Sequence, residues 1–569
     1  MFFVLDELNQ NNLSQTVDPQ AKEKDEQLGL SITKTIQEAI DIAQEGGIIK
    51  ISPGLYKENI YINKPGLRLE PKEKTGDIII FAQKSAAITI DLDLNQKCFI
   101  IGIKLCHSGF NEEEVNSKLD EYNRIMARIY NYEDKSKHGI SADKSIEKSQ
   151  KDSFEFDRIN NINQDSKKKS QFGKNKRNKM NQSISNIDQE QLEQEKGNKK
   201  QPTIGILVKS SDCLIKDSNI HSHQLGGIHL WGNKNTKIKI QNNKVQNCLP
   251  RGNGICCGGP DCQIFIEGND ISKNFIGVNI GIANQAQIVK NQIYFNSFGI
   301  EIISGDPFVF NNQIEKNLVA GILTRTFGEF RCDGIIKRNE YIRCNKEYGI
   351  VCQGENNFTK IEKNENISYN KKSGIKVEDK AHAYIYRNSI FKNIGQGILI
   401  VESASAIIES NEVADNLKAN IALGGFGSQN SVIVSNKIKG GRCEGIFLID
   451  ASECWILRNK IYENNDGIIM VMSIPWVEKN EIYRNKSNGV MAIKDSRPKF
   501  QKNLIEQNGF IGLFIRDKSN GDITGNNIWG NKKTNLLVEQ RIKKLDNILK
   551  VFQEEGDIRI PQNYRCTLI

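Results

Sequence analysis

Carboxylate side chains recur at one place in the C-terminal half of the sequence, directly after a repeated Gly-Ile-x-Ile stretch. Paired carboxylates can act as a general acid and base, or bind Ca²⁺ through their oxygens. Basic residues such as Lys380, Lys494 and Arg516 interrupt the series, so a solvated turn edge is the competing interpretation, and we predict no catalytic residue from it. The acids are Glu378, Asp379, Glu402, Asp450, Asp495 and Asp517.

Three histidines, His221, His223 and His229, occur close to Trp231, a grouping that could bind a metal ion or a sugar. We expect His221 and His223 in a loop and His229 pointing outward from a strand. No acidic residue or cysteine beside them completes a recognisable set of metal ligands. The cysteines of 256–262 lack a paired partner cluster too. The sequence therefore predicts neither a metal ion nor a cofactor.

A repeat with a step of mostly 21–23 residues must position these side chains. It has the form Asn-x-Ile/Val-x-x-Asn-x-x-(x)-Gly-Ile-x-Ile, as in the copies that begin at Asn459 and Asn480. The two short runs of alternating Ile and Val are typical of strands, and a helical repeat would need longer amphipathic windows and a longer step. The repeat therefore predicts an all-β solenoid, a parallel β-helix with about three short strands per coil.

The first asparagine of each copy should stack on its counterpart in the next coil. Side-chain amides stacked in this way can satisfy both their donors and their acceptors. We therefore predict a structural amide ladder that includes Asn243, Asn269, Asn291, Asn312, Asn339, Asn388, Asn411, Asn436, Asn459, Asn480, Asn503 and Asn526.

Composition divides the 569 residues into five segments. We predict a flexible segment at 1–30, a cap helix and first coils at 31–109, and the main repeats at 201–538. Between them, 110–200 should hold a helix at 112–132, which packs on the solenoid or binds a partner, and then a disordered stretch. The basic run 167–179 is either a polyanion-binding or nuclear-import patch or a solvated loop. An apolar stripe after 538 predicts a second cap helix within 539–569.

A stripe of apolar residues should face outward on the C-terminal coils. In Gly-Ile-x-Ile the two Ile side chains point inward, so x points outward. Here x is apolar over at least six coils, and such a patch is covered either by the C-terminal part of this chain or by a partner protein. The predicted partner-binding residues are Leu399, Phe447, Ile469, Met491, Phe514 and Leu537.

The order of helix, Gly46-Gly47-x-Ile49-x-Ile51-x-Pro53-Gly54-x-Tyr56 and Asn-x-Ile…Gly-Ile repeats resembles the right-handed β-helix repeat proteins of the pectin-lyase-like superfamily. Within it, the chain is most similar to the carbohydrate-binding and sugar-hydrolysis domain group, which includes β-helical F-box proteins and the Shc-binding-protein family. The resemblance covers about 31–106 and 201–540. It implies a right-handed coil, and a function in either carbohydrate chemistry or protein assembly.

These features lead us to expect a non-catalytic scaffold that binds other proteins within an intracellular assembly, with a cytoskeletal or ciliary one as the candidate. The alternative is a carbohydrate-active enzyme or a polysaccharide-binding protein of the pectin-lyase-like type. The thirteen cysteines indicate a reducing compartment, the cytoplasm. No run of 18 apolar residues predicts a membrane span, and we do not expect nucleic acid as a partner.

Overall fold

The computed structural model describes residues 2–4, 31–107 and 203–539, apart from short gaps at 83–85, 94–95, 210, 233–235, 249–250, 260–261, 282–284, 327, 426–429 and 451. The chain divides into two compact units, of which one comprises 1–108 with 202–569 and the other 109–201. The predicted helices at 112–132 and within 539–569, and the basic run 167–179, lie outside the described residues. Everything below concerns the first unit.

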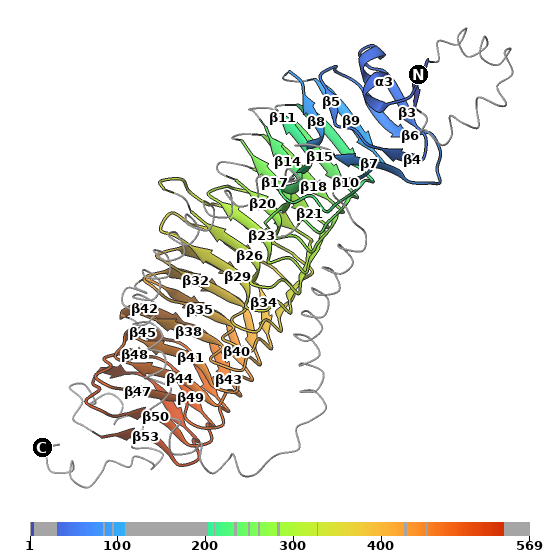
Figure 1. Cartoon of the computed structure of the whole chain (residues 1–569). Helices are drawn as coiled ribbons and strands as arrows, with labels where there is room; N and C mark the ends of the chain where they lie inside the picture. Colours follow the sequence, from blue (N-terminus) through green and yellow to red (C-terminus); the bar gives the residue numbers. More distant parts are fainter. Residues whose placement is uncertain are drawn as a thin grey trace, which may run out of the picture. The chain divides into compact units, whose positions relative to one another are not determined.

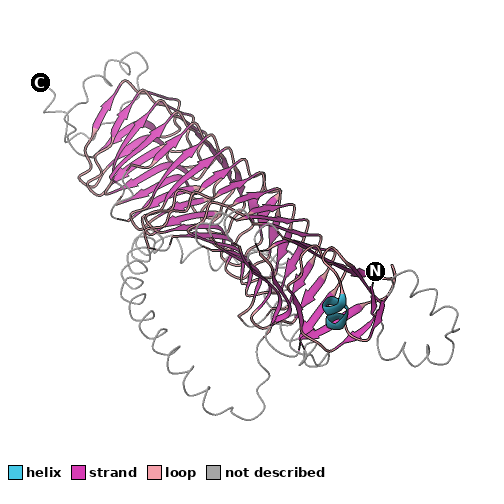
Figure 2. Ribbon diagram, turned by 90° about the horizontal axis from the view of Figure 1, so that it is seen from above, coloured by secondary structure: helices cyan, strands magenta, loops and turns pink. Residues whose placement is uncertain are grey.

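That unit is the predicted parallel β-helix (Figure 1). Each coil contributes one strand to each of three parallel sheets, as β15 (Lys237–Gln241), β16 (Lys244–Gln246) and β17 (Asn253–Gly258) do. Strands make up nearly the whole of the unit in Figure 2, with one short helix at the N-terminal end. The prediction of an all-β solenoid is confirmed.

Sheet A collects the first strand of each coil, together with two strands from the start of the chain. Phe2–Val4, inside the predicted flexible segment 1–30, forms β1 and pairs with β2 and β3. The strands of sheet A are β1 (Phe2–Val4), β2 (Ser31–Thr33), β3 (Ile48–Ile51), β6 (Arg68–Pro71), β9 (Lys97–Ile101), β12 (Asp212–Lys216), β15, β18 (Gln263–Glu267), β21 (Gln287–Val289), β24 (Phe308–Phe310), β27 (Ile335–Lys337), β30 (Lys360–Glu362), β33 (His382–Tyr386), β36 (Ser405–Glu409), β39 (Val432–Val434), β42 (Ser452–Leu457), β45 (Ile474–Glu478), β48 (Lys499–Gln501) and β51 (Asp522–Thr524).

Sheet B collects the shortest strands, which lie between the two bends that hold asparagine. They are β4 (Gly54–Tyr56), β7 (Ile78–Ala82), β10 (Lys104–His107), β13 (Asn219–His221), β16, β19 (Asp270–Ser272), β22 (Gln292–Tyr294), β25 (Gln313–Glu315), β28 (Tyr341–Arg343), β31 (Ile367–Ser368), β34 (Ser389–Phe391), β37 (Glu412–Ala414), β40 (Lys437–Lys439), β43 (Lys460–Tyr462), β46 (Glu481–Tyr483), β49 (Leu504–Glu506) and β52 (Asn527–Trp529).

Sheet C holds the Gly-Ile-x-Ile strands. They are β5 (Ile60–Ile62), β8 (Ala86–Asp91), β11 (Ile204–Lys209), β14 (Gly226–Trp231), β17, β20 (Ile276–Ile280), β23 (Phe298–Ile303), β26 (Ala320–Arg325), β29 (Tyr348–Gln353), β32 (Ile375–Glu378), β35 (Ile398–Ile400), β38 (Ile421–Gly424), β41 (Glu444–Ile449), β44 (Asp466–Val471), β47 (Val490–Ile493), β50 (Ile511–Ile515) and β53 (Thr534–Val538).

The 108–202 segment does not interrupt the stacking of the coils. Strand β11 pairs directly with β8, β12 with β9 and β13 with β10. The two stretches of repeat that this segment separates in the sequence are therefore parts of one solenoid with one continuous core.

Isoleucine forms most of that core because alternate residues of each strand point inward. In β15, Ile238 and Ile240 are fully buried while Lys237 and Lys239 are exposed. The same alternation repeats in successive coils, so branched aliphatic side chains stack along the axis. Each fully buried Ile contributes about 1.5–3 kcal/mol relative to an exposed one.

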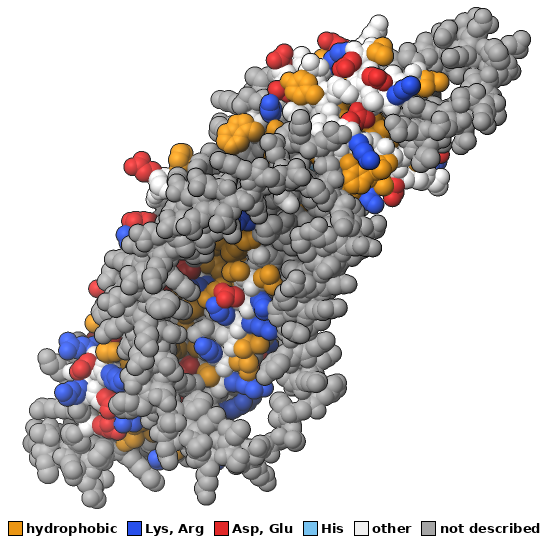
Figure 3. All heavy atoms as spheres, in the orientation of Figure 1, with side chains coloured by type: hydrophobic (Ala, Val, Ile, Leu, Met, Phe, Trp, Pro, Cys, Tyr) orange, Lys and Arg blue, Asp and Glu red, His pale blue; other side chains and the backbone are white. Residues whose placement is uncertain are grey.

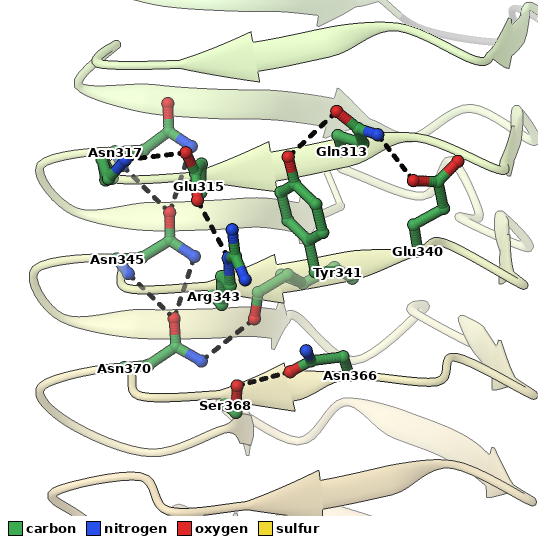
Figure 4. A network of polar contacts seen from close by, with 12 residues as sticks. Gln313, Glu315, Asn317, Glu340, Tyr341, Arg343, Asn345, Asn366, Ser368 and Asn370 are labelled. Carbon is green, nitrogen blue, oxygen red and sulfur yellow. Dashed lines mark hydrogen bonds and ion pairs between the residues drawn. The ribbon is translucent and has the colours of Figure 1, made fainter.

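Asparagine amides form two continuous series of hydrogen bonds, one at each bend that flanks sheet B. At the first bend, the side chains from Asn243 to Asn526 are linked, each Nδ2 donating to the Oδ1 of the next at 2.8–3.0 Å. Asn364, absent from the predicted set, takes its place in this series. A second series runs from Asn274 to Asn535 and uses the second asparagine of the repeat; Figure 4 shows its members Asn317, Asn345 and Asn370.

Helix α3 (Ile36–Ile42) lies at the N-terminal end of the solenoid, within the segment 31–109 for which a cap helix is predicted (Figures 1 and 2). Thr35 caps it and forms a capping box with Glu38. Ile36, Ala39 and Ile40 are buried against the first coils. Among the described residues, no helix is long and apolar enough to cross a membrane.

Candidate functional site

The outer face of sheet C carries the most varied chemistry of the described surface. The residues at position x are in register along the sheet, so each lies beside its counterpart in the next coil. The residue two positions after x also points outward and forms a second column. We call the outward side chains of β14–β32 the polar half, and those of β35–β53 at position x the apolar half.

Trp231 is the most exposed tryptophan of the protein, with 63% of its surface accessible. Its ring lies over Gly258 of the next coil, where an added Cβ would be 2.7 Å from Cε3 and 2.8 Å from Cζ3. Gly258 therefore makes room for the indole to lie along the sheet. The ring thus packs against this glycine while most of the residue stays accessible, and an accessible aromatic ring can stack on the apolar face of a sugar.

Next to Trp231, position x runs through four consecutive polar residues, His229, Cys256, Asn279 and Glu301. The His229 ring lies over Gly226, and its Nε2 has no hydrogen-bond partner among the described residues. Burial lowers the pKa of His229, and this nitrogen is itself buried, so it is not accessible to a ligand.

Glu301 is a carboxylate at position x that is only 4% exposed. The Arg325 guanidinium forms an ion pair with it at 2.7 Å, and the Asn279 amide donates to its other oxygen at 2.8 Å. Burial raises the pKa of Glu301, and Arg325 and the Asn279 hydrogen bond oppose that rise. A carboxylate held in this way is pre-organised, and Arg325, half exposed, presents its remaining N–H groups to solvent.

The polar half ends in a second group of charged and amide side chains. Lys376 pairs with Glu378 on the same strand, and Gln353 donates to Glu378 at 2.6 Å. Tyr348 lies beneath two lysines, with Lys376 Nζ 5.2 Å and Lys372 Nζ 5.0 Å from its ring centroid. Between the two groups, position x is apolar at Leu323 and Val351, which form a small buried cluster with Ala320, and the polar side chains of these two coils, Arg325 and Gln353, stand in the second column.

The apolar half brings together the predicted outward stripe. Its side chains are adjacent in register, from Leu399 through Ala422, Phe447, Ile469, Met491 and Phe514 to Leu537. Ile469 is buried with Ile449 and Val471, and Phe447 and Met491 pack against them half-buried. The partner-binding role that the sequence predicts for this stripe stays a prediction.

The line of acids has a conformational explanation. Asp379, Glu402, Asp450, Asp495 and Asp517 all have φ between 50° and 58°. They occupy the left-handed turn that leaves sheet C, a region that aspartate tolerates better than most side chains. Glu378 ends β32 and pairs with Lys376 instead. These acids are not paired carboxylates.

The other histidines and the cysteines are structural. His221 ends strand β13, so its predicted loop position is wrong, and its Nε2 is 2.9 Å from Cys106 Sγ. His223 is fully buried with its Nδ1 3.0 Å from Thr203 Oγ1. The described cysteines are free thiols, and burial raises the pKa of several to about 12, Cys98 among them. No three His, Cys, Asp or Glu side chains are grouped as metal ligands in the part of the chain that the structure describes.

Sheets A and B also carry aromatic side chains, but their rings face other side chains. Figure 4 shows such a network on sheet B, where Tyr341 donates to Gln313 and Arg343 pairs with Glu315 at 2.9 Å. Arg343 also lies 4.1 Å from the Tyr341 ring centroid. On sheet A, Lys499 Nζ lies 3.7 Å from the ring centroid of Trp476. These rings have side-chain partners; Trp529 on sheet B is exposed as well, at 39%, but less so than Trp231.

The polar half was only partly visible in the sequence. His229, Asn279 and Glu301 can be identified at position x, but Cys256 was missed because the coil of Gly254 has a cysteine, Cys257, in place of the second isoleucine of the motif. Arg325, Gln353 and the Trp231 platform belong to the second outward column, which follows the repeat motif. Extending the alternation by two residues would have found that column.

Comparisons with solved structures return proteins of the same fold. The periplasmic alginate epimerase AlgG is 14% identical over 53% of this chain and 76% of its own, with a TM-score of 0.37. The AlgE6 A-module, a mannuronan C-5 epimerase of Azotobacter vinelandii, is 11% identical over 88% of this chain and 92% of its own, with a TM-score of 0.28. PfbA, a surface adhesin of Streptococcus pneumoniae, is 11% identical over 84% and 87%, with a TM-score of 0.23. At these identities the likeness concerns the fold alone. No curated protein matches the sequence.

The prediction of a non-catalytic intracellular scaffold is wrong as the main interpretation. The comparisons favour the alternative instead, since AlgG is named an alginate epimerase and the AlgE6 and AlgE4 A-modules mannuronan C-5 epimerases. The physical reason for the error is that the prediction weighed only the apolar half of sheet C. The polar half supports the alternative that the sequence left open.

The sequence model of the right-handed β-helix region matches residues 183–329, 226–365, 331–473 and 456–542. Together these matches cover more than half of the chain, and they span the coils that carry both halves of sheet C. The chain therefore belongs to the family of right-handed β-helix proteins.

Proposed function

We propose that this protein binds a polysaccharide along the polar half of sheet C. The observation that carries the proposal is the Trp231 ring, which lies over Gly258 and stays largely accessible. An aromatic face buries the C–H face of a sugar ring, and adjacent polar groups can bond its hydroxyls. Asn279 and Arg325, two and four coils further along the sheet, supply such groups.

An extended ligand fits this site better than a single sugar. Its groups lie on successive coils about 4.8 Å apart along the solenoid axis. The face shown in Figure 3 carries hydrophobic, basic and acidic side chains between the grey regions, with no single type dominating. A polymer of repeating units can follow such a series of coils.

Hydrolysis by a pair of carboxylates is not the chemistry that this arrangement favours. Glycosidases place two carboxyl groups about 5–9.5 Å apart across the scissile bond. Glu301 and Glu378 are three coils apart, roughly 14 Å at the usual strand spacing. Proton transfer by Glu301 alone is the second candidate, because burial raises the pKa of that carboxyl.

The test is a binding measurement on the purified chain against a panel of oligosaccharides. We expect Trp231→Ala to weaken binding about tenfold or more, because a stacking contribution of roughly 1.4 kcal/mol is lost. The matched control is Trp529→Ala, since Trp529 is an exposed tryptophan, 39% accessible, on sheet B. Equal losses in both variants, or no binding by the unaltered chain, would overturn the proposal.

Product analysis in the same samples separates binding from catalysis. If Glu301 transfers a proton, Glu301→Gln should abolish turnover of a bound glycan while the variant still binds it. Turnover that persists in Glu301→Gln would remove the second candidate and leave the binding proposal intact.

A further inference from the structure

We infer that the glycan taken by the polar half is electrically neutral, and not a polyuronate or sulfated chain. This inference rests on the proposed function and names its ligand class. It follows from how the charged side chains of sheet C are paired.

The strands of sheet C from β8 to β32 carry three acidic and three basic residues. Each acid has a base beside it. Asp91 of β8 pairs with Lys209 of β11 at 3.1 Å, Glu301 with Arg325 at 2.7 Å, and Glu378 with Lys376. The described strands of this face therefore contribute no net charge.

Several cations in the flanking turns are paired in the same way. In the turn that leaves β26, Arg331 pairs with Asp333 at 2.9 Å, and Lys380 after β32 pairs with Glu355 after β29 at 3.0 Å. Where the chain enters β29 and β32, Lys372 pairs with Glu347 at 2.8 Å. Arg251, Lys273 and Lys346, in the turns that enter β17, β20 and β29, have no ion pair among the described residues, so the complete pairing is a property of the strands of this face.

A polyanionic glycan presents one carboxylate or sulfate on every unit or two, and each must lose water as it meets the surface. A groove that takes such a chain needs cations without partners to offset this cost. On the polar half, an incoming carboxylate would compete with Glu301 for Arg325 and with Glu378 for Lys376. Glu301 is nearly inaccessible and would be left buried without its partner, which is unfavourable.

The remaining groups suit hydroxyls. The Asn279 and Gln353 amides can each donate or accept a hydrogen bond, and the spare N–H groups of Arg325 donate. Trp231 supplies the stacking surface. Neutral sugars offer this combination of hydroxyls and an apolar C–H face.

The experiment compares neutral and uronic-acid oligosaccharides of equal length by titration calorimetry, at low and at high ionic strength. We expect neutral chains to bind at least about tenfold more tightly, with less than about a twofold change between the two salt conditions. Tighter binding of uronate chains that falls steeply with salt would overturn the inference but leave glycan binding standing. Failure of every glycan class would overturn the proposed function itself.

A charge variant provides an independent readout. Glu301→Gln removes one negative charge and leaves Arg325 unpaired, so this variant should gain affinity for uronate chains by about tenfold relative to the unaltered protein. The matched control is Glu481→Gln, which frees Lys460 on sheet B from a 3.0 Å ion pair and changes net charge equally. Equal gains in both variants, or none in Glu301→Gln, would count against the inference; Glu378→Gln repeats the test should Glu301→Gln fail to fold.

Discussion

Asparagine recurs at two bends of each coil because the backbone there is strained and buried. The residue before each ladder position has a positive φ, as Arg458 does at 55° and Lys479 at 56°. Such conformations cost a non-glycine residue about 1 kcal/mol or more. The asparagine that follows donates to a carbonyl of the coil before and accepts from the asparagine of that coil, as Asn459 does with Ile433 and Asn436, and it also donates to the asparagine of the coil after, Asn480. The ladder therefore fixes a bend that the local sequence alone would not adopt.

At this scale, the histidine at the start of the solenoid should make stability depend on pH. Burial lowers the pKa of His221 from an ordinary 6.5 to about 4. The unfolded chain takes up a proton near pH 6.5 while the folded chain does not, so stability is full above pH 6.5 and falls as pH drops towards 4. The loss from this group is about 3 kcal/mol.

The measurement is urea unfolding across that pH range. His221→Gln should show a shallower decline than the unaltered protein, by about that amount at pH 4. His382→Gln serves as control, because His382 is exposed on sheet A. If all three proteins lost stability in parallel, titration of His221 would not contribute.

Residue spacing predicted most of the first ladder, and the exceptions have local causes. Asn364 was missed because its coil has one extra residue, Asn366, before Ile367, and so departs from the Asn-x-Ile spacing. The second ladder uses an asparagine that the repeat also contains, but no spacing rule distinguishes an amide that stacks from one that is merely exposed at a turn. That distinction needs the register of neighbouring coils.

At the scale of the elements, one coil lacks the asparagine of the second bend, and an asparagine from a neighbouring strand takes its place. The bend after β40 has Gly440 and Gly441 where other coils have a left-handed residue and an asparagine. Asn420, at the start of β38, supplies the missing amide. It accepts from Asn416 at 2.8 Å and donates to Asn464 at 2.8 Å, so the second ladder continues across the gap.

This arrangement predicts a strong coupling between the two positions. Asn420→Gly removes both hydrogen bonds, and Gly441→Asn alone creates a clash, since an added Cβ would lie 2.8 Å from the Asn420 amide nitrogen. Each single variant should lose about 1–3 kcal/mol of stability. The double variant restores the arrangement of the other coils, glycine before the strand and asparagine at the bend, and should regain most of that loss. The measurement is a double-mutant cycle of unfolding free energies. If the losses of the two single variants simply added in the double variant, Asn420 would not be replacing the bend asparagine.

At the scale of the whole molecule, the sequence predicted the architecture much better than the function. A repeat specifies the fold because every copy reports the same strand positions, as the copies at Asn459 and Asn480 do. The polar half depends instead on differences between copies, such as glycine at 258 beneath Trp231 and arginine at 325 beside Glu301. Which of these side chains lie next to one another is known only when the register of neighbouring coils is known.

Stability should also vary along the solenoid, because each coil contacts only its neighbours and an end coil lacks one of them. Helix α3 covers the N-terminal end, and Glu58 of the first coil holds it there. Its two carboxylate oxygens accept the backbone N–H groups of Ile36 and Gln37 at the helix N-terminus, each at 3.0 Å. A carboxylate in this position also interacts favourably with the helix dipole.

Glu58→Gln keeps the size of the side chain but removes its charge and one of the two acceptors. We expect a local loss of about 1 kcal/mol, seen as roughly fivefold faster hydrogen exchange in α3 and β3–β6, with little change from β36 onward. Glu355→Gln is the control, because Glu355 is largely exposed and far along the chain. Faster exchange along the whole solenoid would mean that the coils unfold as one cooperative unit and that α3 does not act as a local cap. Unchanged hydrogen exchange in β3–β6 would mean that the first coils remain folded without the contribution of the helix.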